Sequence, residues 1–154
     1  MSATTFTTPA RDARDTGTGR AAAVEAAYRR LRRFLALDAV VTGGNALAYL
    51  ALPGPIGELL GVSRGVLTEV GAVLLLFAAA VAALAARRRP PAVGAALVVD
   101  VNLLWPVLSL VALLAWFSPT APGLVWIPLQ AATVGGFAAL QYLALRAVRA
   151  AERG

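Results

Sequence analysis

Asp100 has the strongest case for chemistry in this sequence, because no other charged residue lies between Arg89 and Arg146. It follows Pro91 by nine residues. A helix that begins there would carry it about 13 Å inward, close to the middle of a bilayer. An ionised carboxylate costs several kcal/mol at that depth, so we expect Asp100 to be protonated or well paired. Two interpretations stay open: a site that handles protons or cations, and a protonated acid whose hydrogen bond ties helices together.

Polar residues also follow one face of residues 35–52. Their spacing of i, i+4, i+7 and i+11 keeps them within about 60° of one another on a helix; they are Asp38, Thr42, Asn45 and Tyr49. A later apolar stretch has a similar stripe, made of Gln130, Thr133 and Gln141. Such stripes either line a water-filled cleft or join helices, because polar groups without partners are costly in lipid. The candidate intramembrane polar site consists of Asp100, Asn102, Asp38, Thr42, Asn45, Gln130 and Thr133.

Asp38 has a simpler interpretation as well. It lies about one turn inside the predicted cytoplasmic boundary of its helix, where Arg32 or Arg33 can reach it. It is therefore either an interfacial carboxylate neutralised by Arg or a member of the candidate site.

The chain contains no His and no Cys. This composition excludes disulfides, thiolate or imidazole metal sites, and nucleophilic catalysis by Cys or His. We therefore expect no cofactor, no metal and no enzymatic activity. The net charge of +6 comes from Arg residues that flank apolar stretches, which is typical of membrane topology signals and not of nucleic-acid binding.

Composition and the lengths of the apolar runs predict an integral membrane protein. Hydrophobic residues make up 59% of the chain and charged residues 14%, whereas about 25% are charged in a soluble domain. The sequence predicts an all-α, four-helix transmembrane bundle over residues 21–154, with spans at about 34–52, 64–86, 92–117 and 124–145. Residues 1–20 are predicted to be a disordered cytoplasmic tail.

The distribution of Arg predicts the orientation. All Arg residues except Arg64 lie before the first span, in the 87–89 loop or after the last span. Both termini are therefore expected in the cytoplasm of a cell whose inner or plasma membrane holds the bundle. Residues 21–33 are Arg-rich with an apolar face, which predicts an amphipathic helix on the membrane surface against anionic lipid headgroups.

The second predicted span carries two stripes of different size. We expect the bulky stripe to face lipid, because lipid is as apolar as Leu; it comprises Val66, Val70, Leu74, Phe77, Val81 and Leu84. We expect the small stripe to allow close helix packing; it comprises Thr68, Ala72, Ala79, Ala83 and Ala86.

Several ordered features resemble those of another group of proteins. They are Leu-Leu-Gly-Val-Ser at 59–63, an Ala- and Leu-rich span that ends in three Arg at 87–89, and Asn-Leu-Leu-Trp at 102–105 followed by Ser109. In these features the chain resembles small four-span membrane proteins of GC-rich, actinobacteria-like bacteria over about residues 34–146. The resemblance implies a topology and no activity.

These observations favour a non-enzymatic membrane protein that is a structural or accessory component of the cell membrane. The alternative is a small proton-coupled transporter or channel that uses Asp100 within the membrane. In either case the partners expected are the lipid bilayer and a homo- or hetero-oligomer, and not nucleic acid.

The absence of native cysteine makes the topology directly testable. Cysteines introduced at Ser2, Pro90 and Gly154 should be protected from a membrane-impermeant thiol reagent added to intact cells, and cysteines at Gly57 and Thr120 should react. Labelling of position 90 from outside would overturn the assignment of the spans.

Overall fold

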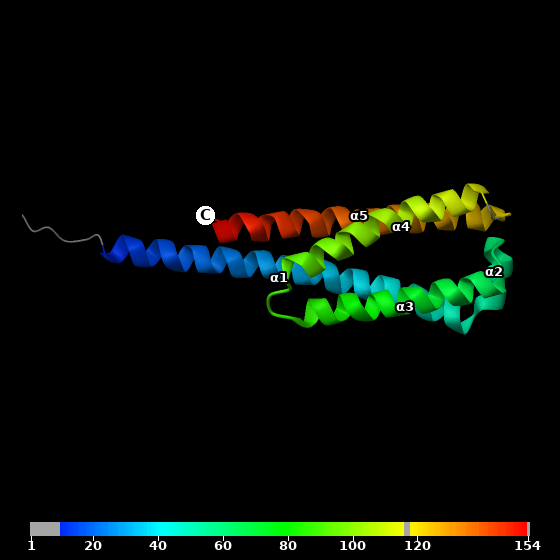
Figure 1. Ribbon diagram of the computed structural model, residues 1–154, viewed down its shortest axis with the longest axis horizontal. Helices are drawn as coiled ribbons and strands as arrows, with labels where there is room; N and C mark the ends of the chain where they lie inside the picture. The colour runs from blue at the N-terminus through cyan, green and yellow to red at the C-terminus, as the bar shows by residue number, and fades with distance from the viewer. Residues whose placement is uncertain (1–9, 116–117, 154) are drawn as a thin grey trace, which may run out of the picture.

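The computed structural model describes residues 10–115 and 118–153, with side chains from residue 17 onward, and is built of helices (Figure 1). The helices are α1 (Ala10–Ala51), α2 (Pro53–Leu60), α3 (Arg64–Ala86), α4 (Ala92–Ala115) and α5 (Ala121–Arg153). All except the short α2 are long and apolar enough to cross a membrane. The prediction of an all-α protein with four long apolar helices is thereby confirmed.

Local sequence signals set the ends of the helices around α2. Pro53 begins α2, where its fixed φ suits a first helical turn. Gly61 ends α2 with φ 72°, a left-handed conformation that glycine adopts without a steric cost. Two residues later the Ser63 side chain accepts a hydrogen bond from the Val66 backbone N–H at 3.3 Å and caps α3.

The four long helices form an open arrangement. Helix α3 packs against α1, α1 packs against α5, and α5 packs against α4. Helices α3 and α4 approach each other near their connecting loop, where Gly94 lies against Leu84. From that loop they diverge towards the end of the molecule that carries α2 (Figure 1). The bundle is therefore open on its α3–α4 side.

Helices α1 and α5 extend beyond the loop between α3 and α4 (Figure 1). The 42 residues of α1 span about 63 Å, twice the thickness of a bilayer core at about 30 Å. In the extension the Tyr28 hydroxyl donates to a Glu152 carboxylate oxygen at 2.6 Å, and Arg20 donates to the Glu152 carbonyl at 2.7 Å. The hydrogen bond to Glu152, together with burial, raises the pKa of Tyr28.

Helix α1 begins at Ala10 and so includes the second half of the predicted tail, whereas residues 1–9 lie outside the described residues. Residues 21–33 continue into the first span without a break, and Tyr28 and Leu31 pack in one core cluster with Val148 of α5. Once a long helix exists, adding turns costs little, and the apolar face of this segment is covered by α5.

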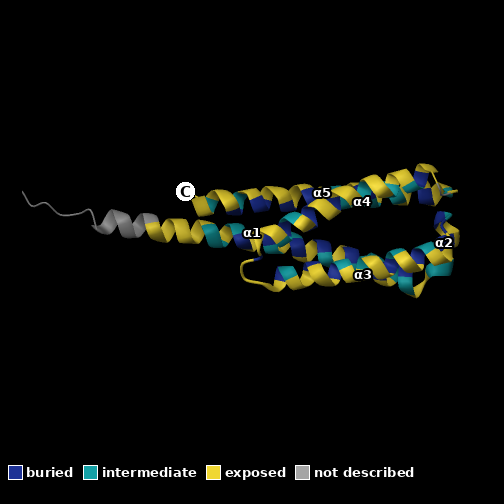
Figure 2. Cartoon of the chain, viewed as in Figure 1, coloured by how far each residue is buried: buried dark blue, intermediate teal, exposed yellow. Residues whose placement is uncertain are grey.

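The prediction for α3 was wrong. Val81 is fully buried and the rest of the bulky stripe is half-buried, whereas the predicted small stripe is exposed along its whole length. A different set of small residues faces the bundle: Gly71, Ala78 and Ala85, one every seven residues. Figure 2 shows the buried residues on the inner sides of the helices.

The contacts of this heptad-spaced set explain the rotation of α3. A Cβ at Gly71 would lie 3.0 Å from Leu50 Cγ, and a Cβ at Gly43 would lie 3.6 Å from Ala78 Cβ. Close approach of the two backbones therefore fixes this face of α3 against α1. The bulky side chains then flank the contact and fill the space beside it.

The structure also changes the best positions for the topology experiment. Pro90 is fully buried, and a Cβ at Gly57 would lie 2.5 Å from the Val62 carbonyl oxygen, so neither site tolerates a reactive cysteine well. Arg88 and Glu58 are exposed neighbours at the same two ends. Cysteine at position 88 should stay protected from the external reagent and cysteine at position 58 should react, and the opposite pattern would reverse the proposed orientation.

Candidate functional site

A buried polar cluster lies where α1, α4 and α5 meet. Its members are Asp38 and Thr42 of α1, Asn102 of α4 and Gln141 of α5; Asp38 and Gln141 have no exposed surface, and the other two are buried. We call these four residues the Asp38 cluster. It is the main group of buried polar side chains in the part of the chain that the structure describes.

The hydrogen bonds of the Asp38 cluster converge on one carboxylate. Asn102 Nδ2 donates to Asp38 Oδ2 at 2.6 Å, and Gln141 Nε2 donates to the same oxygen at 2.8 Å. Thr42 Oγ1 donates to Asp38 Oδ1 at 3.0 Å. Asn102 Nδ2 also donates to Gln141 Oε1 at 3.1 Å, so the two amides are joined to each other as well. The side chains of three helices thus satisfy one another.

The partners of Asp38 differ from the Arg expected from the sequence. Arg32 Nε instead donates to the Ala85 carbonyl at 2.9 Å, at the end of α3, and Arg33 is exposed. Neutral donors therefore surround the carboxylate, with amide and hydroxyl groups in place of a cation. Carboxylates accept such hydrogen bonds at several lone pairs, so three donors on two oxygens are readily accommodated.

Apolar residues close the cluster on the side of the helix extensions. Leu31, Leu35, Val81, Leu145 and Val148 lie there in one buried core. The other side is less tightly packed. A small cavity of about 80 Å³ touches Thr42 and Asn102 and is otherwise lined mainly by apolar side chains.

A second polar group lies further along α1, towards the α2 end. Asn45 Nδ2 donates to Gln130 Oε1 at 2.9 Å. Trp126 Nε1 donates to the Tyr49 hydroxyl at 3.1 Å, and Gln130 Nε2 reaches the same oxygen at 3.5 Å. This group links α1 to α5 and lies beside a cavity of about 230 Å³.

The candidate site predicted from the sequence is divided among several places. Asp38, Thr42 and Asn102 come together in the buried cluster, and Asn45 pairs with Gln130 in the second group. Thr133 is exposed and donates to the Leu129 carbonyl of its own helix at 2.9 Å.

Asp100 belongs to neither group. It is exposed on α4, and no hydrogen bond or ion pair joins it to another residue within 10–115 and 118–153. Asn102, only two residues further along the same helix, points inward. The two residues therefore mark opposite faces of α4 at similar depth.

Gln141 was missing from the predicted site, although it lay on a predicted inward stripe. A signal for it existed: Asp38 follows Arg33 by five residues and Gln141 precedes Arg146 by five. Because α1 and α5 are antiparallel, these equal distances place the two side chains at one depth. Tyr49 and Trp126 were likewise not included, and their contact depends on how α1 and α5 are rotated against each other.

Substitutions of Asp38 test how much the cluster contributes to the stability of the fold. Asp38→Leu should lower the free energy of unfolding by about 3 kcal/mol or more, because it leaves two buried amides without their acceptor. Asp38→Asn should cost about 1 kcal/mol, because its oxygen still accepts from both amides and Thr42 can accept from its N–H₂. Thermal unfolding in detergent measures both.

Val40→Leu is the matched control, since Val40 is 72% exposed on the same helix. It should behave as the unmodified protein does. Equal stability of Asp38→Leu and Val40→Leu would show that the cluster does not hold the helices together.

Comparisons with other proteins add no site to this arrangement. No protein-family model matches the chain, and no curated protein or solved structure matches it either. The resemblance to small four-span membrane proteins of GC-rich bacteria therefore remains a prediction from the sequence.

Proposed function

We propose that this protein is a non-enzymatic, multi-pass component of the cell membrane with a structural or accessory role. The observation that supports this role is the closed state of the Asp38 cluster. Asp38 accepts hydrogen bonds from the other three members, and among the described residues none of the fully buried polar side-chain atoms lacks a partner. A buried network of this kind makes the arrangement of helices specific.

The position of Asn102 adds to this argument. Along the described residues the backbones of α1 and α4 do not pack against each other. Asn102 nevertheless reaches Asp38 of α1 at 2.6 Å and Gln141 of α5 at 3.1 Å. Its amide therefore holds α4 to the other two helices, which is a structural task.

We further propose that both termini lie in the cytoplasm. In support, the exposed Arg29 and Arg30 of α1, Arg88 of the α3–α4 loop and Arg149 of α5 are all at the end of the molecule that holds the helix extensions. A positive end of this kind favours the cytoplasmic side and anionic lipid headgroups.

Asp100 supports the proposal of an oligomer or a partner protein. A charged side chain exposed to hydrocarbon at this depth costs about 2.5–3.5 kcal/mol on insertion scales. A neighbouring transmembrane helix that donates hydrogen bonds to Asp100 would remove much of that cost. An accessory protein needs such a contact surface, and the exposed face of α4 provides one.

Gentle purification tests the accessory role. In native mass measurements, the protein should appear in a complex heavier than its own 15.8 kDa. Asp100→Leu should reduce that complex, whereas Val40→Leu, on an exposed part of α1, should not. A monomer of 15.8 kDa with no associated protein, in the unmodified chain, would contradict the proposal.

The second candidate function is a proton-coupled carrier, and it now depends on Asp38 rather than Asp100. The cavities of about 230 and 80 Å³ share Leu74 and Trp105 as lining residues, and the smaller one reaches Thr42 and Asn102. This series of cavities leads from the α2 end of the bundle towards the Asp38 cluster. Asp100 lines neither cavity.

Proton flux into vesicles separates the two functions. A structural protein should leave the rate of acidification, followed with an enclosed pH-sensitive dye, equal to that of empty vesicles. A carrier should raise the rate, and Asp38→Asn should abolish the increase while the free energy of unfolding falls by only about 1 kcal/mol. Asp100→Asn is the control. Loss of proton flux in that variant alone would show that Asp100, and not Asp38, is the proton site.

A further inference from the structure

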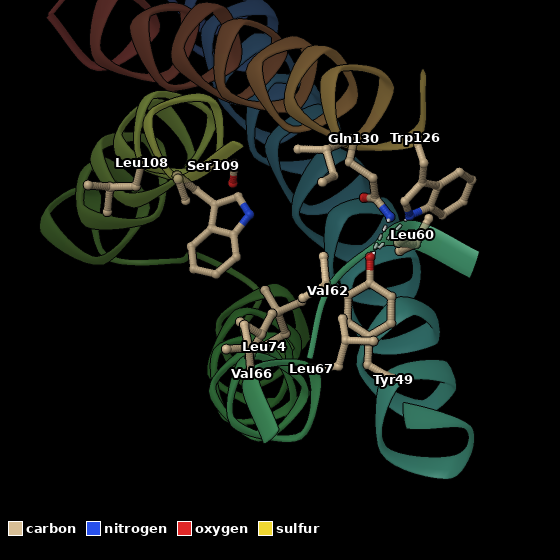
Figure 3. A pocket seen from close by; sticks show the side chains of 14 residues that line it. Tyr49, Leu60, Val62, Val66, Leu67, Leu74, Leu108, Ser109, Trp126 and Gln130 are labelled. Carbon is tan, nitrogen blue, oxygen red and sulfur yellow. Dashed lines mark hydrogen bonds between the residues drawn. The ribbon is translucent and has the colours of Figure 1, made fainter. Parts of the chain in front are cut away.

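The larger of these two cavities has a lining that neither candidate function explains. Figure 3 shows its lining side chains, which come from α1, α3, α4 and α5, with Leu60 and Val62 from α2 and the loop after it. Its volume is about 230 Å³. That exceeds the roughly 150 Å³ of an engineered apolar cavity that binds benzene, but is smaller than the 300–1,000 Å³ typical of drug-sized sites.

The walls of this cavity are mainly aliphatic, and no charged residue lines it. Val66, Val70 and Leu74 of α3 line it, as do Leu108 and Ala112 of α4. Ionised ligands would lose their hydration here without gaining a counter-charge. The lining therefore favours a neutral, mostly apolar molecule.

Polar side chains also line the cavity, and hydrogen bonds converge on one of them, Tyr49. The Tyr49 oxygen accepts hydrogen bonds from Trp126 Nε1 and Gln130 Nε2. Among the described residues nothing accepts the hydrogen of the Tyr49 hydroxyl itself, and the Asn45 contact holds Gln130 in place. Tyr49 is only 9% exposed and lines the cavity, so its hydroxyl can rotate to direct this hydrogen to an acceptor there. It is available to an acceptor oxygen on a ligand.

Both α3 and α4 line the cavity, and they are the neighbouring pair that diverges towards the α2 end (Figure 1). This arrangement favours a route into the cavity between the two helices. In a bilayer this opening faces hydrocarbon, so a ligand would enter sideways from the lipid phase and not from water.

We propose that this cavity binds a small, neutral, lipid-soluble molecule with one acceptor oxygen, such as a medium-chain alcohol or ketone, taken up from the bilayer between α3 and α4. The oxygen accepts from the Tyr49 hydroxyl and the chain lies along the aliphatic walls. This proposal goes beyond the functions above and holds whether the protein is an accessory component or a carrier.

Quenching of tryptophan fluorescence tests the proposal, because Trp105 and Trp126 line the cavity. The chain has one other tryptophan, Trp116, and Trp116→Phe removes its fluorescence. This variant serves as the background for all further substitutions. The protein is placed in phosphatidylcholine vesicles and titrated with ω-bromooctanol or with bromooctane of the same chain length. Bromooctanol should give a saturable component of quenching at lower concentration than bromooctane.

Three substitutions define the site. Tyr49→Phe should weaken the binding of bromooctanol about fivefold and leave bromooctane unchanged, because one hydrogen bond is lost. Ala112→Phe fills the cavity and should remove the saturable component, and Val70→Phe should do so from α3. Val111→Phe, on the exposed neighbour of Ala112, is the matched control and should retain it.

Quenching that rises linearly with probe and is equal in Ala112→Phe and Val111→Phe would overturn the proposal, since it would report only probe dissolved in lipid. Saturable binding that is equal for the two probes and unaffected by Tyr49→Phe would overturn the assignment of an acceptor oxygen.

Discussion

The burial of the Asp38 carboxylate is the constraint on which the rest of the bundle depends. A carboxylate removed from water is tolerated only where polar partners surround it. Asn102 and Gln141 must therefore lie at the level of Asp38, and each must face inward. This requirement fixes the depth and rotation of α4 and α5 relative to α1. Apolar contacts between helices in lipid would specify these quantities only weakly.

Helix α3 is held by a different interaction, and the difference shapes the molecule. It contributes no side chain to the Asp38 cluster, and it packs on α1 through Gly71 and Ala78. The pair of α1 and α3 therefore forms mainly by close backbone approach, with one hydrogen bond from Arg32 to the Ala85 carbonyl, and the group of α1, α4 and α5 forms by hydrogen bonds between buried side chains. Nothing of either kind joins α3 to α4 away from their loop, which leaves the space that the larger cavity occupies.

The features that could be predicted from the sequence follow from the bilayer. Four apolar runs broken by proline, glycine and arginine predict four long helices, and the stripe from Asp38 to Tyr49 predicts one inward face. The face of α3 could not be predicted in the same way. Both its stripes are apolar, so exposure to lipid costs them little and periodicity alone does not choose between them. The choice depends on the fit of Gly71 to Leu50, which is a property of two helices together.

Asp38 and Asp100 show why depth alone does not identify a functional carboxylate. Both lie within the apolar part of the chain, yet the former accepts three hydrogen bonds and the latter accepts none from the residues that the structure describes. An acid that accepts several hydrogen bonds from neighbouring helices stabilises its own fold. An acid on an outer face that accepts no hydrogen bond within its own chain can accept one from another chain. The donor would be a residue such as Arg, Asn or Gln on a neighbouring helix. The same residue type thus serves internal cohesion at position 38, whereas at position 100 we propose that it serves assembly, and the rotation of α4, fixed by Asn102, separates the two residues.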